Sequence, residues 1–293
     1  MPKTEQTITG PTRREFGLMG TAAITAAALP GQAGKITAAQ VIERIQRNVG
    51  VPWNPQTRDV FKAGDPGTAV TGIATTVMST LSILQRAARA GRNLVITHEP
   101  TFWSDSDATR EIGDDEVFRI KSDFIRKNNM VVWRFHDHWH ARKPDAMLVG
   151  LAQDLRWTDA LDDSKRVYRF GPTTLGELAA DMQNRLKFRV IRMIGDPATK
   201  VAKGAINVGS TSLQVVMKLL PEVDVFVAGE PREWEGPEYA QDAVAAGQKK
   251  GMIIIGHQVS EDPGMRLCAE WVRSFVAEVP VEWIPTADPF SRG

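Results

Sequence analysis

Histidine is confined to three short stretches of this 293-residue chain, and each stretch directly follows an apolar run of β-strand length. The five histidines are His98, His136, His138, His140 and His257. Helix-like segments separate the apolar runs, which is typical of β-α-β units with parallel strands. The carboxyl ends of parallel strands gather at one edge of a sheet, so histidines far apart in the sequence are expected to meet there. We therefore predict an α/β fold.

Carboxylates accompany the histidines, as Glu99, Asp137 and Glu261. Imidazole and carboxylate ligands together suit zinc, iron(II) or manganese, and the lack of cysteine pairs argues against a structural zinc site. A histidine by itself is more often a hydrogen-bonded structural residue, and the run from 136 to 140 also fits a solvated strand edge. All five histidines at strand ends favour a metal site.

The geometry of the third motif depends on where the following helix begins. His257 and Glu261 are four residues apart and would share one face of a helix. However, Pro263 suits the first helical position with Asp262 as its cap, so we expect the pair to lie on the preceding loop. Glu230, at another strand end, fits equally well a helix cap, a carboxylate that supports a ligand, or a solvated group.

The charge and cysteine content exclude some classes of protein. The chain has 36 Lys and Arg against 35 Asp and Glu, so it shows no footprint for nucleic acid or an anionic membrane surface. The single cysteine, Cys268, cannot form an internal disulfide. We interpret it as a small core residue.

The first 33 residues differ from the rest of the chain. Arg13 and Arg14, with Phe16 shortly after, precede a mild Ala-rich apolar stretch and a small-residue end at Ala33. This resembles a twin-arginine signal peptide, and the stretch is too short to span a bilayer. We predict export to the periplasm or the extracellular space, cleavage near Ala33 and no stable membrane insertion afterwards. The alternative is a frayed Ala-rich helix.

The rest of the chain is predicted to form two α/β lobes, residues 34–160 and 161–293. Their sheets are expected to be largely parallel, with the metal site in the cleft between the lobes.

Several stretches resemble one known family over nearly the whole mature chain. Thr97-His98-Glu99-Pro100 resembles a Thr-His-His-Pro motif that ends a strand, and His257 with Glu261 resembles a C-terminal His-x-x-x-Glu. Thr174-Leu-Gly-Glu-Leu-Ala, Gly195-Asp-Pro-Ala and Gly209-Ser resemble stretches of the family's second lobe. The family is the dinuclear-metal-centre hexameric one, known through NGG-one-interacting factor three and the type-two GTP cyclohydrolase I homologues.

The resemblance implies a metal-ligand set in which two positions are exchanged. His98, His257 and Glu261 match the family's ligands. Glu99 replaces a histidine, and His140 replaces an aspartate when the preceding histidine is aligned with His136. The implied ligands are His98, Glu99, His136, His140, His257 and Glu261. Asp137 and His138 are the candidate catalytic groups, and Asp137 is an alternative bridging carboxylate.

We predict a metal-binding protein with a dinuclear centre, two divalent transition metals per chain (zinc, iron or manganese), and hydrolase activity on an unidentified small molecule. The resemblance also implies a homo-hexamer. A GTP substrate is disfavoured because an exported protein would not meet the cytoplasmic nucleotide pool. The alternative is a non-catalytic metal-binding, assembly or regulatory protein, which would tolerate a closed ligand shell where an enzyme needs an open metal position.

Overall fold

The structure is a computed structural model that describes residues 35–164 and 166–291. Two β-sheets and their covering helices make up these residues, so the predicted α/β class with largely parallel sheets is confirmed. The predicted signal peptide, residues 1–33, lies outside the described residues and stays a prediction. Within the described ranges, no helix is both long and apolar enough to cross a membrane.

The first sheet has five strands in the order β1-β4-β3-β2-β11. They are β1 (Phe61–Ala63), β2 (Ile73–Thr76), β3 (Leu94–Thr97), β4 (Val131–Arg134) and β11 (Val281–Trp283). All neighbours are parallel except β1, which pairs antiparallel with β4 at the edge. Strand β3 is buried on both faces: Leu94 and Ile96 join the cluster that includes α1 (Ala38–Asn48), whereas Val95 joins residues of α2 (Leu81–Arg89) and α3 (Glu116–Lys127). Helices on both faces explain its uninterrupted apolar sequence.

The second sheet has six strands in the order β5-β6-β8-β9-β10-β7. They are β5 (Asp159–Ala160), β6 (Val167–Thr174), β7 (Arg192–Ile194), β8 (Lys200–Thr211), β9 (Val225–Pro231) and β10 (Gly251–Ile254). The central β8, β9 and β10 are parallel, and the outer strands are antiparallel. The accompanying helices are α6 (Leu175–Leu186), α7 (Leu213–Leu219) and α8 (Gly236–Ala245).

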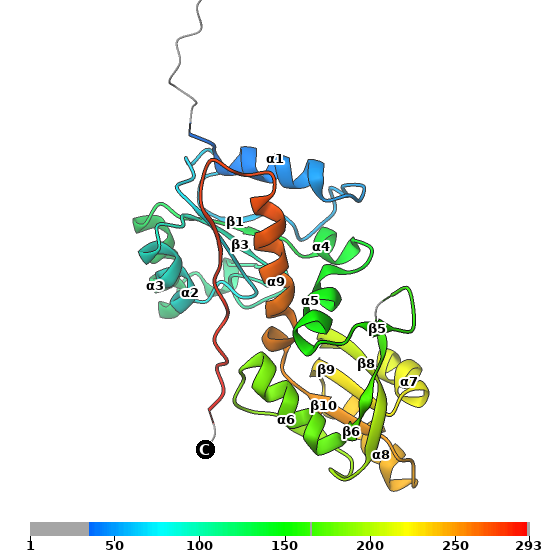
Figure 1. The fold of residues 1–293 in the computed structure, drawn as a ribbon. Coiled ribbons are helices and arrows are strands. Elements are labelled where there is room, and N and C mark those ends of the chain that lie inside the picture. The colour runs from blue at the N-terminus through cyan, green and yellow to red at the C-terminus, as the bar shows by residue number, and fades with distance from the viewer. Residues whose placement is uncertain (1–34, 165, 292–293) are drawn as a thin grey trace, which may run out of the picture. The chain divides into compact units, whose positions relative to one another are not determined.

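Helix α9 (His257–Arg273) packs along α5 (Ala146–Leu155) and contacts strands of both sheets, β2 and β11 in one and β8 and β9 in the other (Figure 1). Glycines allow the close helix approach: a Cβ on Gly150 would meet the backbone nitrogen of Gly264 at 2.5 Å. Cys268 of α9 is fully buried and free, as predicted.

The lobe limits 34–160 and 161–293 stay a prediction. The topology adds that β11, late in the chain, pairs with β2 of the first sheet.

The predicted start of the last helix was wrong. Helix α9 begins at His257, after Gly256 with φ +95°, and Pro263 lies inside the helix. The Asp262 carboxylate does not cap a helix, because it accepts hydrogen bonds from the backbone N–H of Thr286 and the indole N–H of Trp283. Strand β8 continues past Gly209 to Thr211.

Candidate metal centre

The ends of four strands supply the side chains of this site. His98 and Glu99 follow β3, and His136 follows β4 as the N-terminal cap of the short helix α4 (Asp137–Ala141). Glu230 lies near the end of β9, and His257 begins α9 after β10. The strands belong to both sheets, so the cluster draws on both halves of the fold.

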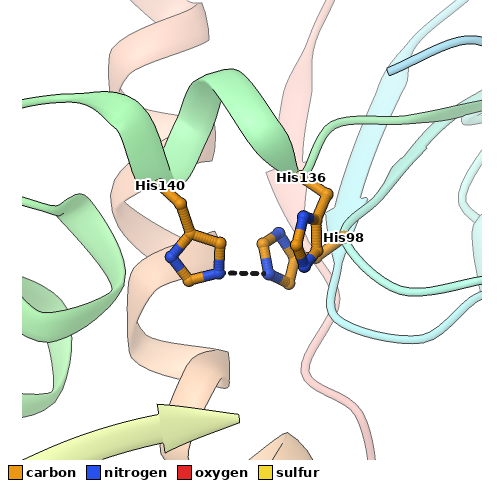
Figure 2. A group of neighbouring side chains, drawn as sticks. All are labelled: His98, His136 and His140. Atoms are coloured by element: carbon orange, nitrogen blue, oxygen red, sulfur yellow. Dashed lines mark hydrogen bonds between the residues drawn. The ribbon is translucent and has the colours of Figure 1, made fainter. Parts of the chain in front are cut away.

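Helix α4 decides which histidines of the second motif meet. His136 and His140 are four residues apart and project from the same side of the helix toward His98 (Figure 2). Nε2 of His140 lies 3.1 Å from Nε2 of His98, and the rings of His98 and His136 stack with centroids 4.6 Å apart. The helical geometry therefore excludes the strand-edge reading of this run.

The first turns of α9 bring His257 and Glu261 to one face. Nε2 of His257 lies 3.1 Å from Oε2 of Glu261 and 3.2 Å from Oε1 of Glu99. Glu261 Oε1 also faces the other half of the cluster, at 3.7 Å from His98 Nε2 and 3.9 Å from His140 Nε2. The six residues predicted as ligands are therefore neighbours in the fold.

Each of the four histidines in the cluster holds its Nδ1 against an oxygen acceptor. His98 Nδ1 lies 3.0 Å from the carbonyl oxygen of Phe135. In the other three, Nδ1 lies 2.7–3.0 Å from a carboxylate oxygen, which belongs to Asp137 for His136, to Asp145 for His140 and to Glu230 for His257. A carbonyl or ionised carboxylate oxygen can only accept, so Nδ1 carries a hydrogen and Nε2 is the ring atom that faces the cluster.

Small residues make room for Glu261. Gly209, at a bulge of β8 with φ +58°, would place a Cβ 2.2 Å from Oε1 of Glu261. Ser260 holds Gly209 close to helix α9, because its hydroxyl accepts a hydrogen bond from the N–H of Gly209 and donates one to the carbonyl of His257. No side chain larger than hydrogen fits at position 209 with Glu261 in place.

A buried arginine organises the acidic side of the cluster. Arg134, 1% exposed, donates to Oε2 of Glu99 at 3.2 Å and to the carbonyl of His98 at 3.1 Å. Burial favours the neutral acid at Glu99 and Glu261, but neighbouring histidines outweigh it and lower the pKa of both carboxyls. Both acids are therefore anions at neutral pH.

The surroundings shift the pKa values of His136 and His257 in opposite directions. Burial, with His98 and His140 nearby, lowers the pKa of His136 to about 4. Burial also disfavours charge on His257, but Glu261 and Glu99 dominate and raise its pKa to about 11. The cluster therefore attracts positive charge most strongly where the two carboxylates converge.

The donor set fits a divalent transition metal. Two groups, His98 with His136 and His140, and His98 with Glu99 and Glu261, each hold their ligand atoms within 4.8 Å of one another. Oε2 of Glu261 is buried without a hydrogen bond of good geometry. A buried carboxylate oxygen in this state is stabilised by a nearby cation, which is either the protonated His257 ring 3.1 Å away or a bound metal ion. Imidazole nitrogens and carboxylate oxygens are ligands of zinc, iron and manganese.

The two candidate catalytic residues lie away from the ligand atoms. Asp137 accepts from Nδ1 of His136, from the Thr57 hydroxyl and from the N–H of Arg58, on the far side of the His136 ring from its Nε2. His138 is buried against Trp53, with both ring nitrogens engaged, Nδ1 by Asp59 at 2.6 Å and Nε2 by the N–H of Asn54 at 2.9 Å. The structure does not bring His138 into the cluster, and the catalytic roles stay predictions.

Three residues that support the cluster were not predicted from the sequence. They are Arg134, Asp59 and Asp145. Asp59 accepts the backbone N–H groups of residues 136, 137 and 138 and so fixes the start of α4. Arg134 carried a readable signal, because a charge within the apolar run Val131 to Phe135 needs a partner. Asp59 and Asp145 had no such signal.

Two cavities open beside the cluster. One, of about 500 Å³, is lined by Glu230, His257 and the segment 288–291. The other, of about 380 Å³, is lined by Glu99, Glu230, His257, Trp103 and Lys121. Both volumes lie in the range of small-molecule sites.

The Duf34/NIF3 (NGG1p interacting factor 3) family model matches residues 59–289, which include the whole cluster. The chain belongs to this family. A comparison with curated proteins gave no match.

Solved structures agree with the family in fold. This NIF3-family chain is similar to the Staphylococcus aureus hypothetical protein SA1388, with 18% identity and a TM-score of 0.69 over 88% of this chain and 100% of that one. It is also similar to a Bacillus cereus protein related to NIF3, at 13% identity and a TM-score of 0.66 over 89% and 100%. Protein ybgI follows at 22% identity and a TM-score of 0.65 over 86% and 99%. These likenesses establish the fold alone.

Proposed function

We propose that this NIF3-family protein binds two divalent transition metal ions at the cluster and uses them to hydrolyse a small-molecule substrate. The observation that carries the proposal is the common arrangement of four histidines, each with Nδ1 on an oxygen acceptor and Nε2 turned inward. Metal-binding histidines are held in this way, because the acceptor sets the tautomer and makes the ligating nitrogen more basic.

The proposed ligands fall into two overlapping sets. His98, His136 and His140 offer three nitrogens on one side, and Glu99, Glu261 and His257 offer mixed ligands on the other. His98 belongs to both of the compact groups, and Glu261 faces both sides, which supports two neighbouring ions. When bound, such a pair would lower the pKa of a water molecule and stabilise developing negative charge on the substrate.

The chain's own groups supply the remaining functions of a hydrolase. Glu230, with a side chain 65% exposed, contacts Nδ1 of His257 and lines both cavities, so it is placed to accept a proton at the mouth of the site. Asp137 is placed to influence the site through the His136 ring. A storage or assembly protein needs neither feature, and the adjoining cavities favour the hydrolase.

Metal analysis of purified protein tests the proposal. We expect one to two zinc, iron or manganese ions per chain, and His257→Ala should lose most of them. The loaded protein is then assayed against carboxylic ester, amide and phosphate ester substrates. Folded protein that takes up none of the three metals would refute the metal centre. Metal-loaded protein that hydrolyses no member of the panel would favour the non-catalytic alternative.

We also propose export by the twin-arginine route, on the basis of Arg13, Arg14 and the small-residue end at Ala33. The mature protein should begin near Gly34, and replacing both arginines with lysine should leave precursor in the cytoplasm. Full-length chains in the cytoplasm of the native host would contradict this.

Finally, we propose a homo-hexamer, on the basis of the family resemblance. Light scattering on the purified mature protein should give six times the mass of one chain. A monomer or dimer at micromolar concentration would contradict it.

A further inference from the structure

Trp103 is exposed in an unusual backbone conformation beside the cluster. Its side chain is 56% exposed, and its φ is +62°, a region that bulky residues rarely adopt. Backbone strain of this kind is kept where the surrounding structure enforces it, often at ligand-binding sites. Trp103 also lines the 380 Å³ cavity together with Glu99 and His257.

The loop that carries Trp103 is tied down at both ends of the turn. The N–H of Phe102 donates to Asp107 Oδ1 at 2.6 Å, and Asp107 pairs with Lys62 at 3.3 Å, where both side chains are buried. On the other side, Nη1 of Arg134 donates to the carbonyl of Asp105 at 2.7 Å. The loop therefore holds Trp103 in place before any ligand arrives.

The same arginine links this loop to the metal centre. Arg134 donates through Nη1 to Asp105 and through Nη2 to Glu99, a proposed ligand. The position of the indole is thus coupled to the position of the Glu99 carboxylate by one buried, planar guanidinium. This arrangement sets a fixed spacing between an aromatic surface and the cluster.

A buried lysine supports the indole. The ammonium of Lys121 lies 5.5 Å from the Trp103 ring centroid and is itself held by the carbonyl oxygen of Thr101. Lys121 is 3% exposed. A cation this close to the ring attracts it and restrains its orientation, while more than half of the Trp103 side chain stays open to solvent and the cavity.

We infer that Trp103 is a stacking platform for a planar, conjugated ring of the substrate, whose polar end reaches the Glu99–His257 side of the cluster. This inference rests on the proposed metal-dependent function and adds the class of substrate. Stacking of an aromatic ring on indole gives a more favourable binding free energy than burial of the same area alone. A flat ring is therefore preferred to a saturated ring of similar size.

Hydroxamate binding to the zinc-loaded full chain tests the inference. Acetohydroxamate, benzohydroxamate and cyclohexanecarbohydroxamate share the metal-binding group and differ in the attached substituent. By calorimetry, we expect wild-type protein to bind benzohydroxamate about fivefold more tightly than the cyclohexane compound. Trp103→Leu should remove that preference while leaving acetohydroxamate affinity unchanged, and Trp103→Phe should retain most of it.

Two control variants test whether the preference for the flat ring depends on Trp103 in particular. Trp234→Leu replaces another exposed tryptophan, which lines neither cavity, and should leave the preference intact. Phe290→Leu changes an exposed aromatic residue of the 500 Å³ cavity and should also leave it intact. If Phe290→Leu loses the preference and Trp103→Leu keeps it, the flat ring of the ligand binds in the 500 Å³ cavity and not beside Trp103. That result would overturn the inference.

The remaining outcomes separate this inference from the proposed function. Acetohydroxamate binding with no preference for the flat ring overturns the platform and leaves the metal centre standing. An unchanged ring preference in Trp103→Leu, with a change in oligomer mass, would assign Trp103 to a contact between copies of the chain and overturn the platform. Failure of the folded protein to take up zinc, iron or manganese overturns the proposed function and this inference with it. Zinc-loaded protein that binds no hydroxamate overturns this inference and leaves the metal centre standing.

Discussion

Nε2 of His140 lies 3.1 Å from Nε2 of His98, and the Nδ1 of each ring faces an oxygen, from Asp145 and from Phe135 respectively. In two neutral rings held in this way, the Nε2 lone pairs point at each other, and a proton or a metal ion is needed between them. Burial disfavours charge on His140, but Asp145 and two further carboxylates prevail and raise its pKa. The pair is therefore built to share a cation.

The helical geometry of α4 predicts that His140 and His138 behave differently. His140→Ala should lose at least one metal ion per chain, because it removes a nitrogen from the cluster. His138→Gln should keep the metal and lower only the stability, since the buried His138 contacts Asp59 and Asn54 instead. Elemental analysis with thermal unfolding checks both variants. Loss of metal from the folded His138→Gln protein would show that His138, contrary to this arrangement, contributes to the metal centre.

Asp145 is predicted to act on metal affinity through His140. Asp145→Asn keeps a residue that caps a helix equally well but removes the charge that orients and polarises the ring. We expect zinc affinity to fall by about tenfold, measured by competition with a chelator. Asp115→Asn is the control, because Asp115 caps α3 in the same way without contact to the cluster. Equal losses in both variants would mean that the effect is not specific to His140.

Gly209 is predicted to be essential for the position of Glu261. Gly209→Ala would place a Cβ 2.2 Å from Oε1 of Glu261 and should displace that carboxylate, so bound metal should fall to half or less. Gly91→Ala is matched, because Gly91 has φ +71° and open space around its Cβ position. Both variants carry roughly 1–2 kcal/mol of backbone strain, and only Gly209→Ala should lose metal. Full metal content in Gly209→Ala would show that Glu261 is not a ligand.

Lys121 is predicted to make stability rise with pH in the alkaline range. Burial lowers its pKa from 10.5 to about 8, against the opposing effect of Asp107. Between these two values the unfolded chain binds a proton that the folded chain does not, so stability increases with pH. Below about pH 8 both states are protonated, and the contribution is constant.

Denaturant unfolding of wild type and Lys121→Met measures this contribution. The stability of wild type relative to the variant should rise by about 2 kcal/mol between about pH 7.5 and about pH 9.5. Lys127→Met, at an exposed position of the same helix, should show no such difference from wild type. A flat difference between wild type and Lys121→Met would mean that the Lys121 ammonium is not desolvated in the folded protein.

The sequence by itself determined the α/β class and several of the side chains that gather at the cluster. Both follow from local patterns. Uninterrupted apolar runs form buried parallel strands, and residues directly after such strands meet at one sheet edge whatever the details of packing. His98, Glu99 and His257 were found in this way.

Only the tertiary structure decided how the motifs are oriented and supported. Asp59, more than 70 residues before the second motif, binds three successive backbone N–H groups and so sets α4, which turns His136 and His140 inward and His138 away. Packing of α9 on α5 and both sheets outweighed the local preference of Pro263 for a helix start. The pairing of Arg134 with Glu99 joins residues 35 positions apart. Each of these outcomes depends on the burial of groups distant in sequence, so no local pattern specifies it.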